Sequence, residues 1–461
     1  MTKAAKWSEE EFEEINLGDE RLNRRIIKLA EQLGAQPQAF INQASEDWAD
    51  TKAAYRFFDN EKVTGAQIIS THSNRVIERM KRYDVVLAIQ DTTEIDYTAH
   101  PEKKGMGQIG NESGKGLLMH ITLAVTTEGL PLGVLAQQIW ARLKKRDRKN
   151  FEHKKVSIKD KESRKWLDAL EQTMTCIGAG VQVVTVCDRE ADVFEFLLRA
   201  EQLGADYLVR AASNRSLMAG EKCLWEELES SVLAGRLEVE VAAKKDEPAR
   251  TAKVSVRYQE VELKPPKRLK KVRIAGWKPI RLWAVYVKEV YAPEGVTPLE
   301  WMLLTNVAVN NIEDALERIE WYCRRWCIEL YHKVLKSGCR VEDCLLETAA
   351  RLKRYLALMS VIAWRLFWLT HINRQNPDAS CTTILAEAEW QALYCRINKT
   401  TELPKQPPTV RQAVRWIAQL GGFLGRKNDG EPGITVIWRG WQRLTDIVAT
   451  WLILHPPQTC G

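Results

Sequence analysis

The sequence lacks most of the short motifs that mark metal, nucleotide or hydrolase sites. Its 10 cysteines include no Cys-x-x-Cys pair, and its 7 histidines form no Cys/His pattern at zinc-finger spacing. It contains neither His-Glu-x-x-His nor Gly-x-Ser-x-Gly, which excludes the common zinc-protease and esterase signatures. The stretch from Gly105 to Gly110 matches Gly-x-Gly-x-x-Gly, but it leads towards a strand and not into a helix. We expect reduced, buried thiols and no dinucleotide site.

Long apolar runs are also missing. The most apolar helical segment has only ten consecutive uncharged residues, Tyr355 to Trp364, whereas a membrane span needs ~20. The first residues are rich in glutamate and have no apolar core of the kind that a signal peptide carries. We therefore expect a cytoplasmic protein, and a chain of 461 residues with 45% hydrophobic residues is long enough for two or three cores.

The net charge is only +7, but the basic residues are concentrated. Segment 142–159 has nine Lys/Arg against two acidic residues, and segment 244–273 has eleven against four. Two such strips suit a polyanion, because each neutralised phosphate releases counterions. For either strip alone, a solvated loop with surplus lysines is the alternative.

The apolar pattern divides the chain into three parts. Residues 1–70 are predicted to form short helices, and one of them has a basic side that either docks on phosphates or faces water. Residues 71–375 alternate strand and helix patterns, which is typical of an α/β architecture. Within them, about 213–300 alternates with period two and predicts an antiparallel β insertion. Residues 376–461 are predicted to be helical with Pro/Gly breaks. The basic side of the first region consists of Arg21, Arg24, Arg25 and Lys28.

Two aspartates follow apolar strand patterns. VVLAIQD (85–91) ends at Asp91, and VQVVTVCD (181–188) ends at Asp188. Sites in open α/β sheets gather at the C-terminal ends of strands. A single aspartate at a strand end is often only a turn or cap residue, but two of them in one domain favour a site.

A third carboxylate comes from a long helix predicted at about 311–337. At about 100° per residue, Tyr322, Arg325, Glu329 and Lys336 fall within an arc of about 60°. An adjoining apolar stripe would pack on the sheet, so we expect Glu329 at the rim where the helix meets the strand ends. The stripe consists of Ile312, Leu316, Ile319, Cys323, Cys327, Leu330 and Val334.

Three carboxylates without clustered histidine or cysteine favour hard divalent ions, Mg²⁺ with Mn²⁺ as a substitute. Two such ions ~3.5–4 Å apart would activate a water or a 3′-hydroxyl and stabilise the leaving oxygen of a phosphodiester. The basic strips identify nucleic acid as the substrate class.

These residues resemble a known family, the DDE transposases of the insertion-sequence-four group, and within it the transposon-five transposase. The resemblance is carried by LAIQDTTEIDY around Asp91, by VCDREAD around Asp188 and by the Tyr-x2-Arg-x3-Glu-x6-Lys spacing. It is collinear over nearly the whole chain and includes LGDERLNRR, AYRFFDN, KESRKW, TPLEWMLLT and LGGF.

The resemblance implies a ribonuclease-H-like catalytic core that is interrupted by the β insertion. It implies an N-terminal domain that binds the inverted repeats at transposon ends, and a C-terminal region that pairs two subunits as a homodimer in a synaptic complex. Asp91, Asp188 and Glu329 match the family's catalytic metal-binding triad.

The resemblance also assigns DNA contacts. Tyr322, Arg325 and Lys336 match residues that hold phosphates and a flipped base near the cleaved end. Trp301 falls where the family carries a tryptophan associated with that base, and stacking on an extruded base is physically reasonable. A buried tryptophan within a strand is the alternative for Trp301.

The predicted function is a cut-and-paste transposase that cleaves double-stranded DNA at inverted repeats and joins the ends to target DNA. A hairpin intermediate is expected from the resemblance alone. A nuclease that cuts without joining and a catalytically silent DNA-binding protein are the alternatives. The whole-length match argues against the first, and the complete triad argues against the second. We expect a bacterial protein that associates with the nucleoid when it acts.

Overall fold

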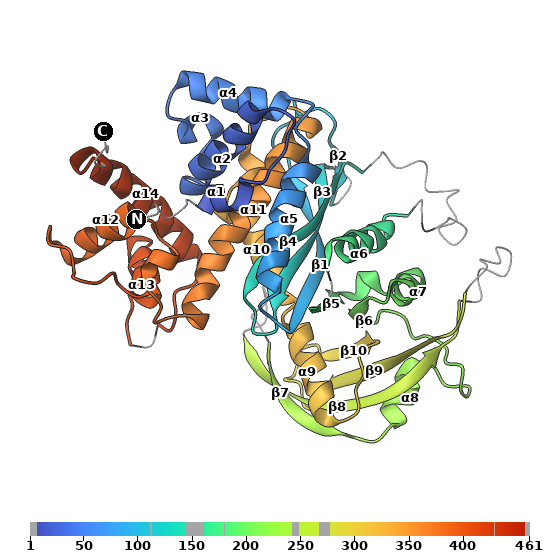
Figure 1. Cartoon of the computed structure of the whole chain (residues 1–461). Coiled ribbons are helices and arrows are strands. Elements are labelled where there is room, and N and C mark those ends of the chain that lie inside the picture. The colour runs from blue at the N-terminus through green and yellow to red at the C-terminus, as the bar shows by residue number, and fades with distance from the viewer. Residues whose placement is uncertain are drawn as a thin grey trace.

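In the computed structural model, helices surround one large twisted sheet (Figure 1). The structure describes residues 7–110, 113–142, 158, 161–178, 180–241, 249–266, 277–427 and 429–456. Most of the basic segment 142–159, and both ends of the segment 244–273, lie outside the described residues.

The sheet has a ribonuclease-H-like half, which confirms the predicted fold class. Its strands are β1 (Val85–Asp96), β2 (Gly107–Ile109), β3 (Gly114–Thr126), β4 (Pro131–Trp140), β5 (Gln182–Cys187) and β6 (Asp206–Arg210). β3 pairs antiparallel with both β1 and β4, whereas β5 lies parallel to β1 and to β6. Valine and isoleucine dominate β1 and β5, as expected for strands that are covered on both faces.

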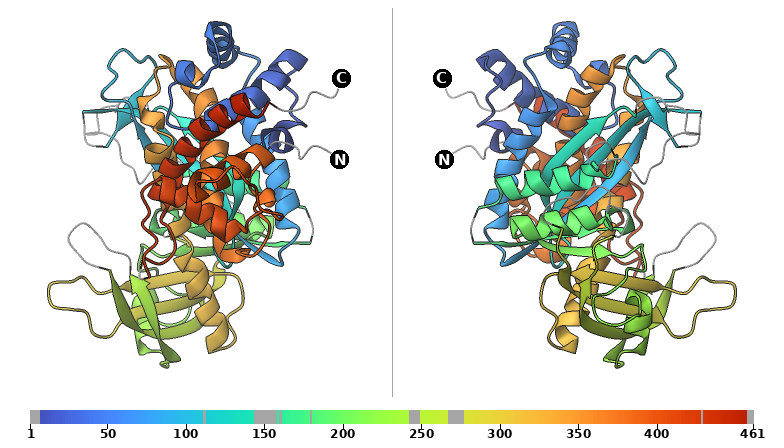
Figure 2. Two further views of the ribbon diagram at one scale, coloured as in Figure 1. Left: turned by 90° about the vertical axis from the view of Figure 1, so that its left-hand side faces the viewer. Right: turned by 90° about the vertical axis from the view of Figure 1, so that its right-hand side faces the viewer.

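The predicted β insertion is present, but it is not a separate sheet. β7 (Gly235–Val241), β8 (Arg250–Leu263) and β9 (Ile280–Glu289) form an antiparallel ribbon beside the short helix α8 (Leu224–Ser230). β10 (Glu300–Thr305) joins this ribbon to the core, because it pairs with β9 on one side and with β6 on the other. The insertion therefore extends the core sheet (Figure 2).

Helices cover both faces of the core sheet. α6 (Arg164–Cys176) and α7 (Phe194–Leu203) share one hydrophobic core with side chains of β5 and β6. α11 (Ala349–Gln375) packs in the larger core, together with the alternate residues of β1 and β5. α11 is apolar and long enough to cross a membrane, but 83% of its most apolar stretch is buried inside the protein, as in a central core helix.

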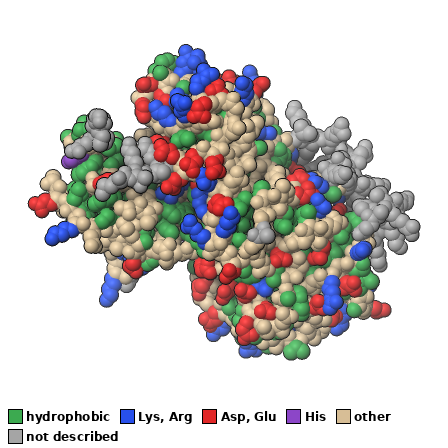
Figure 3. Space-filling view, in the orientation of Figure 1, with side chains coloured by type: hydrophobic (Ala, Val, Ile, Leu, Met, Phe, Trp, Pro, Cys, Tyr) green, Lys and Arg blue, Asp and Glu red, His purple; other side chains and the backbone are tan. Residues whose placement is uncertain are grey.

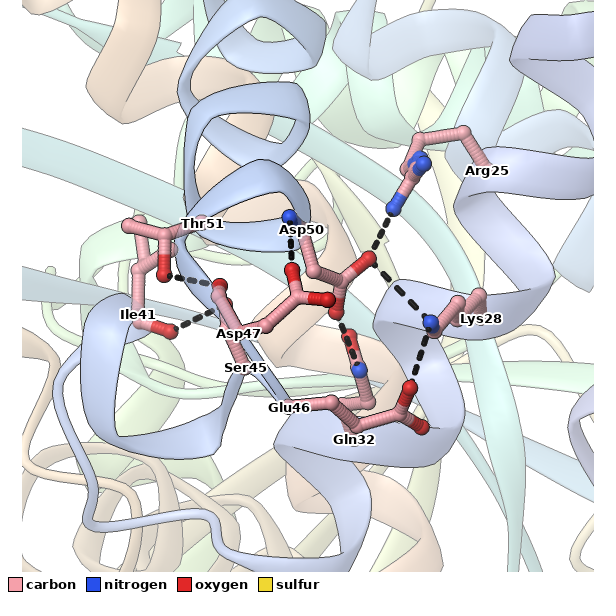
Figure 4. Close-up of polar contacts among 9 residues, drawn as sticks. All are labelled: Arg25, Lys28, Gln32, Ile41, Ser45, Glu46, Asp47, Asp50 and Thr51. Carbon is pink, nitrogen blue, oxygen red and sulfur yellow. Dashed lines mark hydrogen bonds and ion pairs between the residues drawn. The ribbon is translucent and has the colours of Figure 1, made fainter.

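The N-terminal region folds into the predicted helices α1 (Trp7–Phe12), α2 (Glu20–Ala35), α3 (Ile41–Ala44), α4 (Trp48–Asp59) and α5 (Gly65–Met80). A buried carboxylate joins α2 to α4 (Figure 4). Asp50, whose side chain is 6% exposed, forms ion pairs with Arg25 and, at 3.2 Å, with Lys28. Half of the predicted basic side of α2 therefore serves the internal packing of this region.

A second buried polar group fixes α1 against the rest of the protein. The carboxylate of Glu11 contacts His72 and Arg79 of α5. His72 accepts a hydrogen bond from the backbone N–H of Val134 in β4, at 2.9 Å. The guanidinium of Arg79 lies 4.3 Å from the ring centre of Trp364 in α11. α1 is thus connected to the edge of the sheet and to the central helix.

The C-terminal region is helical, as predicted, and consists of α12 (Glu387–Asn398), α13 (Val410–Leu420) and α14 (Ile434–Leu454). It packs against α11 and α2, and the indole N–H of Trp441 donates to the carbonyl of Gly34 at 3.2 Å. The last turn of α14 exposes three apolar side chains, Leu452, Ile453 and Leu454.

Candidate active site

The pairing of β1 with β5 brings the two predicted aspartates together. The strands run parallel with Ile89 opposite Val186, and both side chains point into the larger core. Side chains alternate along a strand, so the positions two residues further on, Asp91 and Asp188, lie on the same face of the sheet. Both carboxyl groups are more than half buried.

The prediction that β1 ends at Asp91 is wrong. The strand continues to Asp96, because β3 remains paired with it and faces Asp91 with Ile121. β5 ends earlier than β1, and Asp91 therefore lies just beyond the part of β1 that pairs with β5. Asp188 follows β5 directly, and its carboxylate accepts a hydrogen bond from the backbone N–H of Glu190 at 2.8 Å.

The single helix predicted for about 311–337 is also wrong, because the chain there forms three segments. α9 (Ile312–Cys323) ends before a turn at 324–325, α10 (Trp326–Lys333) follows, and Val334–Gly338 is π-helical. The Nε of Arg324 donates to the carbonyl of Thr127 at 2.8 Å, which ties the turn to the loop between β3 and β4. Breaks of this kind occur often at functional sites.

Most of the predicted apolar stripe does face the core. Ile319 and Val334 are buried, and four further members are partly buried against the same core: Ile312, Leu316, Cys327 and Leu330. Cys323, the last residue of α9, is the exception, because its side chain is exposed. α10 also buries Ile328, Tyr331 and His332.

Glu329 nevertheless lies on the side of α10 that faces the aspartates, together with Arg325. The two side chains form an ion pair within α10 and its preceding turn. Burial, helped by the nearby Asp188 and Glu329 carboxylates and opposed by Arg325, raises the pKa of Asp91 to about 6. Burial also raises the pKa of Asp188. The site therefore gathers negative charge that one guanidinium offsets.

The donor set fits a hard divalent cation, since Asp91, Asp188 and Glu329 offer carboxylate oxygens only. In the part of the chain that the structure describes, no three such groups already converge on one point where a metal ion could lie. The ion pair with Arg325 accounts for this, because it turns the carboxylate of Glu329 towards a guanidinium. Glu329 would have to exchange Arg325 for a metal ion to complete the set.

A buried histidine that the sequence reasoning missed lies beside Asp91. The Nδ1 of His332 is 3.7 Å from an Oδ of Asp91, and its buried Nε2 has no hydrogen-bond partner among the described residues. Burial lowers the pKa of His332 to about 3, so the ring is neutral at physiological pH. Its position three residues after Glu329 was a usable signal, because both then share one helix face.

The predicted base-binding residues form one aromatic pair. The rings of Trp301 on β10 and Tyr322 on α9 meet edge to face, with centres 5.2 Å apart. Trp301 is half-buried, but Tyr322 is only 5% exposed. The side chain of Arg210, at the end of β6, also lies at the Tyr322 hydroxyl and donates to the carbonyl of Glu300 at 3.0 Å.

Lys336 does not share the immediate surroundings of Glu329. The π-helical segment turns it towards Glu342, and the two charged groups are 3.1 Å apart. Glu342 in turn accepts a hydrogen bond from the backbone N–H of Asp96, at the end of β1. Lys336 therefore flanks the site beyond His332, and Arg325 alone among the predicted cations contacts the triad.

Comparison with family models accounts for most of the chain. Residues 91–366 match the transposase DDE domain, residues 4–63 match a transposase DNA-binding region, and residues 361–451 match the transposase Tn5 dimerisation domain. The DDE match begins at Asp91 and includes Asp188 and Glu329. With its ribonuclease-H-like sheet and this order of regions, the chain belongs to the DDE transposases, the metal-dependent enzymes that cleave and transfer DNA, and it is of the Tn5 type.

Proposed function

We propose that Asp91, Asp188 and Glu329 are the catalytic triad, and that they hold two Mg²⁺ ions for which Mn²⁺ can substitute. The observation that supports this most is the common face of β1 and β5, which carries both aspartates beneath α10. Bound ions would supply an activated water or 3′-hydroxyl and would neutralise charge on the leaving oxygen. The neutral ring of His332, which lies beside Asp91, would restrict the movement of the Asp91 carboxylate.

The cations and aromatic rings around the triad would position the DNA. Arg325 is a donor that can move from Glu329 to a phosphate once a cation binds the carboxylate. Lys336 would hold a second phosphate on the far side of His332. The ring of Trp301, packed on Tyr322, would stack on a base that leaves the duplex, which favours cleavage through a hairpin.

The flanking regions would supply the DNA ends and the second subunit. We propose that residues 1–70 recognise inverted repeats, that residues 71–375 carry the chemistry, and that residues 376–461 form the homodimer of a synaptic complex. The exposed apolar end of α14 supports this last role, because unpartnered leucine and isoleucine side chains are typical of an interface. The enzyme would act on the nucleoid in the cytoplasm and insert the excised ends into target DNA.

An assay on an end-labelled duplex that carries the element's inverted repeat tests this proposal. We expect Asp91→Asn, Asp188→Asn and Glu329→Gln each to reduce cleavage in Mg²⁺ by about 1000-fold or more, because each removes a metal ligand. Specific end binding in a gel-shift assay should remain within about threefold, since phosphate and base contacts outside the triad fix the register.

The matched control is Glu190→Gln, which removes an exposed carboxylate two residues from Asp188. It should cleave at the wild-type rate. Full cleavage by any one of the three triad variants would remove that residue from the triad. A denaturing gel separates nicked strands from hairpins, so cleavage without a hairpin band would contradict the hairpin step alone.

A further inference from the structure

Among the residues that the structure describes, one nearly buried cation close to Asp188 has no strong partner. The side chain of Lys165, in the first turn of α6, is 12% exposed, and its ammonium lies 3.4 Å from a carboxylate oxygen of Glu190. Glu190 is itself 65% exposed, and a long ion pair to an exposed carboxylate contributes little, about 0–1 kcal/mol.

Two other shielded cations, Arg215 and Arg250, are paired differently. Arg215, which is 11% exposed, forms two hydrogen bonds with the fully buried carboxylate of Asp192. Arg250, which is 15% exposed, makes a two-pronged contact with the carboxylate of Glu289. Burying a charge is costly unless it is well paired, so the weak pairing of Lys165 calls for a further anion.

The surroundings of Lys165 place this anion at the active site. Glu190, its ion-pair partner, is the residue whose backbone N–H holds the Asp188 carboxylate. Lys165 reaches this turn from α6, on the face of the sheet opposite α10, and the ring of Trp166 beneath it is 5.4 Å from the ammonium. Arg325 lies on the α10 side of the site, where it pairs with Glu329, so the two cations flank the site from different elements.

Resting on the proposed function, we infer that Lys165 binds a phosphate of the DNA strand at the active site, on the α6 side of Asp188, opposite Arg325. The ligand is a backbone phosphate and not a base. The lysine ammonium is a compact charge with three donors, which suits a phosphate, and its nearly buried position keeps it from contacting the edge of a base. Lys165 and Arg325 together would hold the strand across the metal site.

Two substitutions separate this role from a structural one. Lys165→Ala should lower the cleavage rate about 10- to 100-fold, the loss expected when a charge-assisted hydrogen bond is removed, while specific end binding changes little. Lys165→Arg should restore most of the rate, because the positive charge returns. If Lys165 served only to pair with Glu190, then Glu190→Gln would cause the same loss. We expect Glu190→Gln to cleave normally.

The contacted phosphate can be located with duplexes that carry one methylphosphonate, an uncharged phosphate analogue, at the cleaved position or at one of its neighbours. With the wild type, neutralising the contacted phosphate should slow cleavage about 10-fold or more. In Lys165→Ala, that same modification should cause no additional loss, whereas the other modifications should keep their full effects. Additive losses at every position, or normal cleavage by Lys165→Ala, would overturn the inference.

Asp188→Asn serves as the parallel reference. If Asp188→Asn still cleaves, the proposed triad is wrong. If Asp188→Asn is inactive and Lys165→Ala is normal, the triad stands and only the role of Lys165 fails. Lys165→Arg also serves as a folding control, because it keeps a long, positively charged side chain at this position of α6.

Discussion

Adjacent arginines on α2 have different environments, although the sequence makes them look equivalent. Arg24 is 77% exposed and pairs with Glu20, one turn earlier on the same helix. Arg25 points inward to Asp50, which is nearly buried. Lysine and arginine side chains of this face therefore divide into those that hold the fold and those that remain available to DNA. Figure 3 shows the mixture of both signs of charge over this part of the surface.

This difference predicts opposite effects of two neighbouring substitutions. Arg25→Ala should lower the free energy of unfolding by about 1–3 kcal/mol, because it leaves the buried Asp50 carboxylate with fewer donors. Arg24→Ala should change it by less than about 0.5 kcal/mol. Arg24→Ala should instead weaken binding to the transposon end and reduce the slope of log affinity against log salt by about 0.9. Thermal unfolding measures the change in stability, and gel shifts at several salt concentrations measure the change in DNA binding. Equal losses of stability in Arg24→Ala and Arg25→Ala would contradict this difference between the two arginines.

At the scale of elements, glycines allow α13 and α14 to cross at backbone contact. A Cβ on Gly440, in the middle of α14, would lie 1.7 Å from the carbonyl oxygen of Ile417 in α13. A Cβ on Gly421, at the end of α13, would lie 1.8 Å from the carbonyl oxygen of Val436 in α14. No side-chain rotation can relieve either contact, so any larger residue forces the two helices apart.

We therefore expect Gly440→Ala to destabilise the C-terminal region by at least about 1–3 kcal/mol, the usual cost of overpacking. This expectation opposes helix propensity, by which alanine is better than glycine by about 1 kcal/mol. Weaker dimerisation should accompany the loss, because α14 carries the exposed apolar end. Calorimetry and sedimentation measure the two effects. Gly433→Ala, at the start of α14, meets no atom within 4 Å and is the control. A stabilised Gly440→Ala would show that the helices can separate at no cost.

At the scale of the whole molecule, Glu11 makes the attachment of α1 sensitive to acid. Burial alone would raise the pKa of this carboxyl, but contacts with His72 and Arg79 outweigh burial and lower its pKa from 4.5 to about 2. A carboxyl with a lowered pKa stabilises the folded state above its unfolded value, and this stabilisation is lost as the pH falls from about 4.5 towards about 2. Burial lowers the pKa of His72, and its contact with Glu11 opposes this shift.

The stability advantage of the wild type over Glu11→Gln should therefore be constant above about pH 5 and shrink steadily below it. The shift corresponds to on the order of 3 kcal/mol at neutral pH, at 1.36 kcal/mol per pH unit. Hydrogen exchange of α1 provides the local measurement and thermal unfolding the global one. An advantage that stays the same down to pH 3 would mean that the ionisation of Glu11 does not hold α1.

The sequence by itself determined the order of the elements and the chemistry of the site. Continuous apolar runs identified β1 and β5, because a strand that is buried on both faces has few polar positions, and period-two alternation identified the β insertion. The flanking helices and the two aspartates followed from local patterns in the same way. The spacing of Tyr322, Arg325, Glu329 and Lys336 is also local, and it pointed to the correct family before any fold was known.

Tertiary structure decided where those residues lie relative to one another. β1 runs past Asp91 because β3 continues beside it, and no local pattern reports on a partner strand. The turn after α9 depends on a hydrogen bond from Arg324 to Thr127, nearly two hundred residues earlier in the chain. Cys323, at the end of α9, is exposed, and the π-helical segment beyond α10 places Lys336 beside Glu342. Lys165 reached the surroundings of Asp188 only through packing of α6 against the sheet, since contacts between distant segments depend on the whole fold and not on the period of one helix.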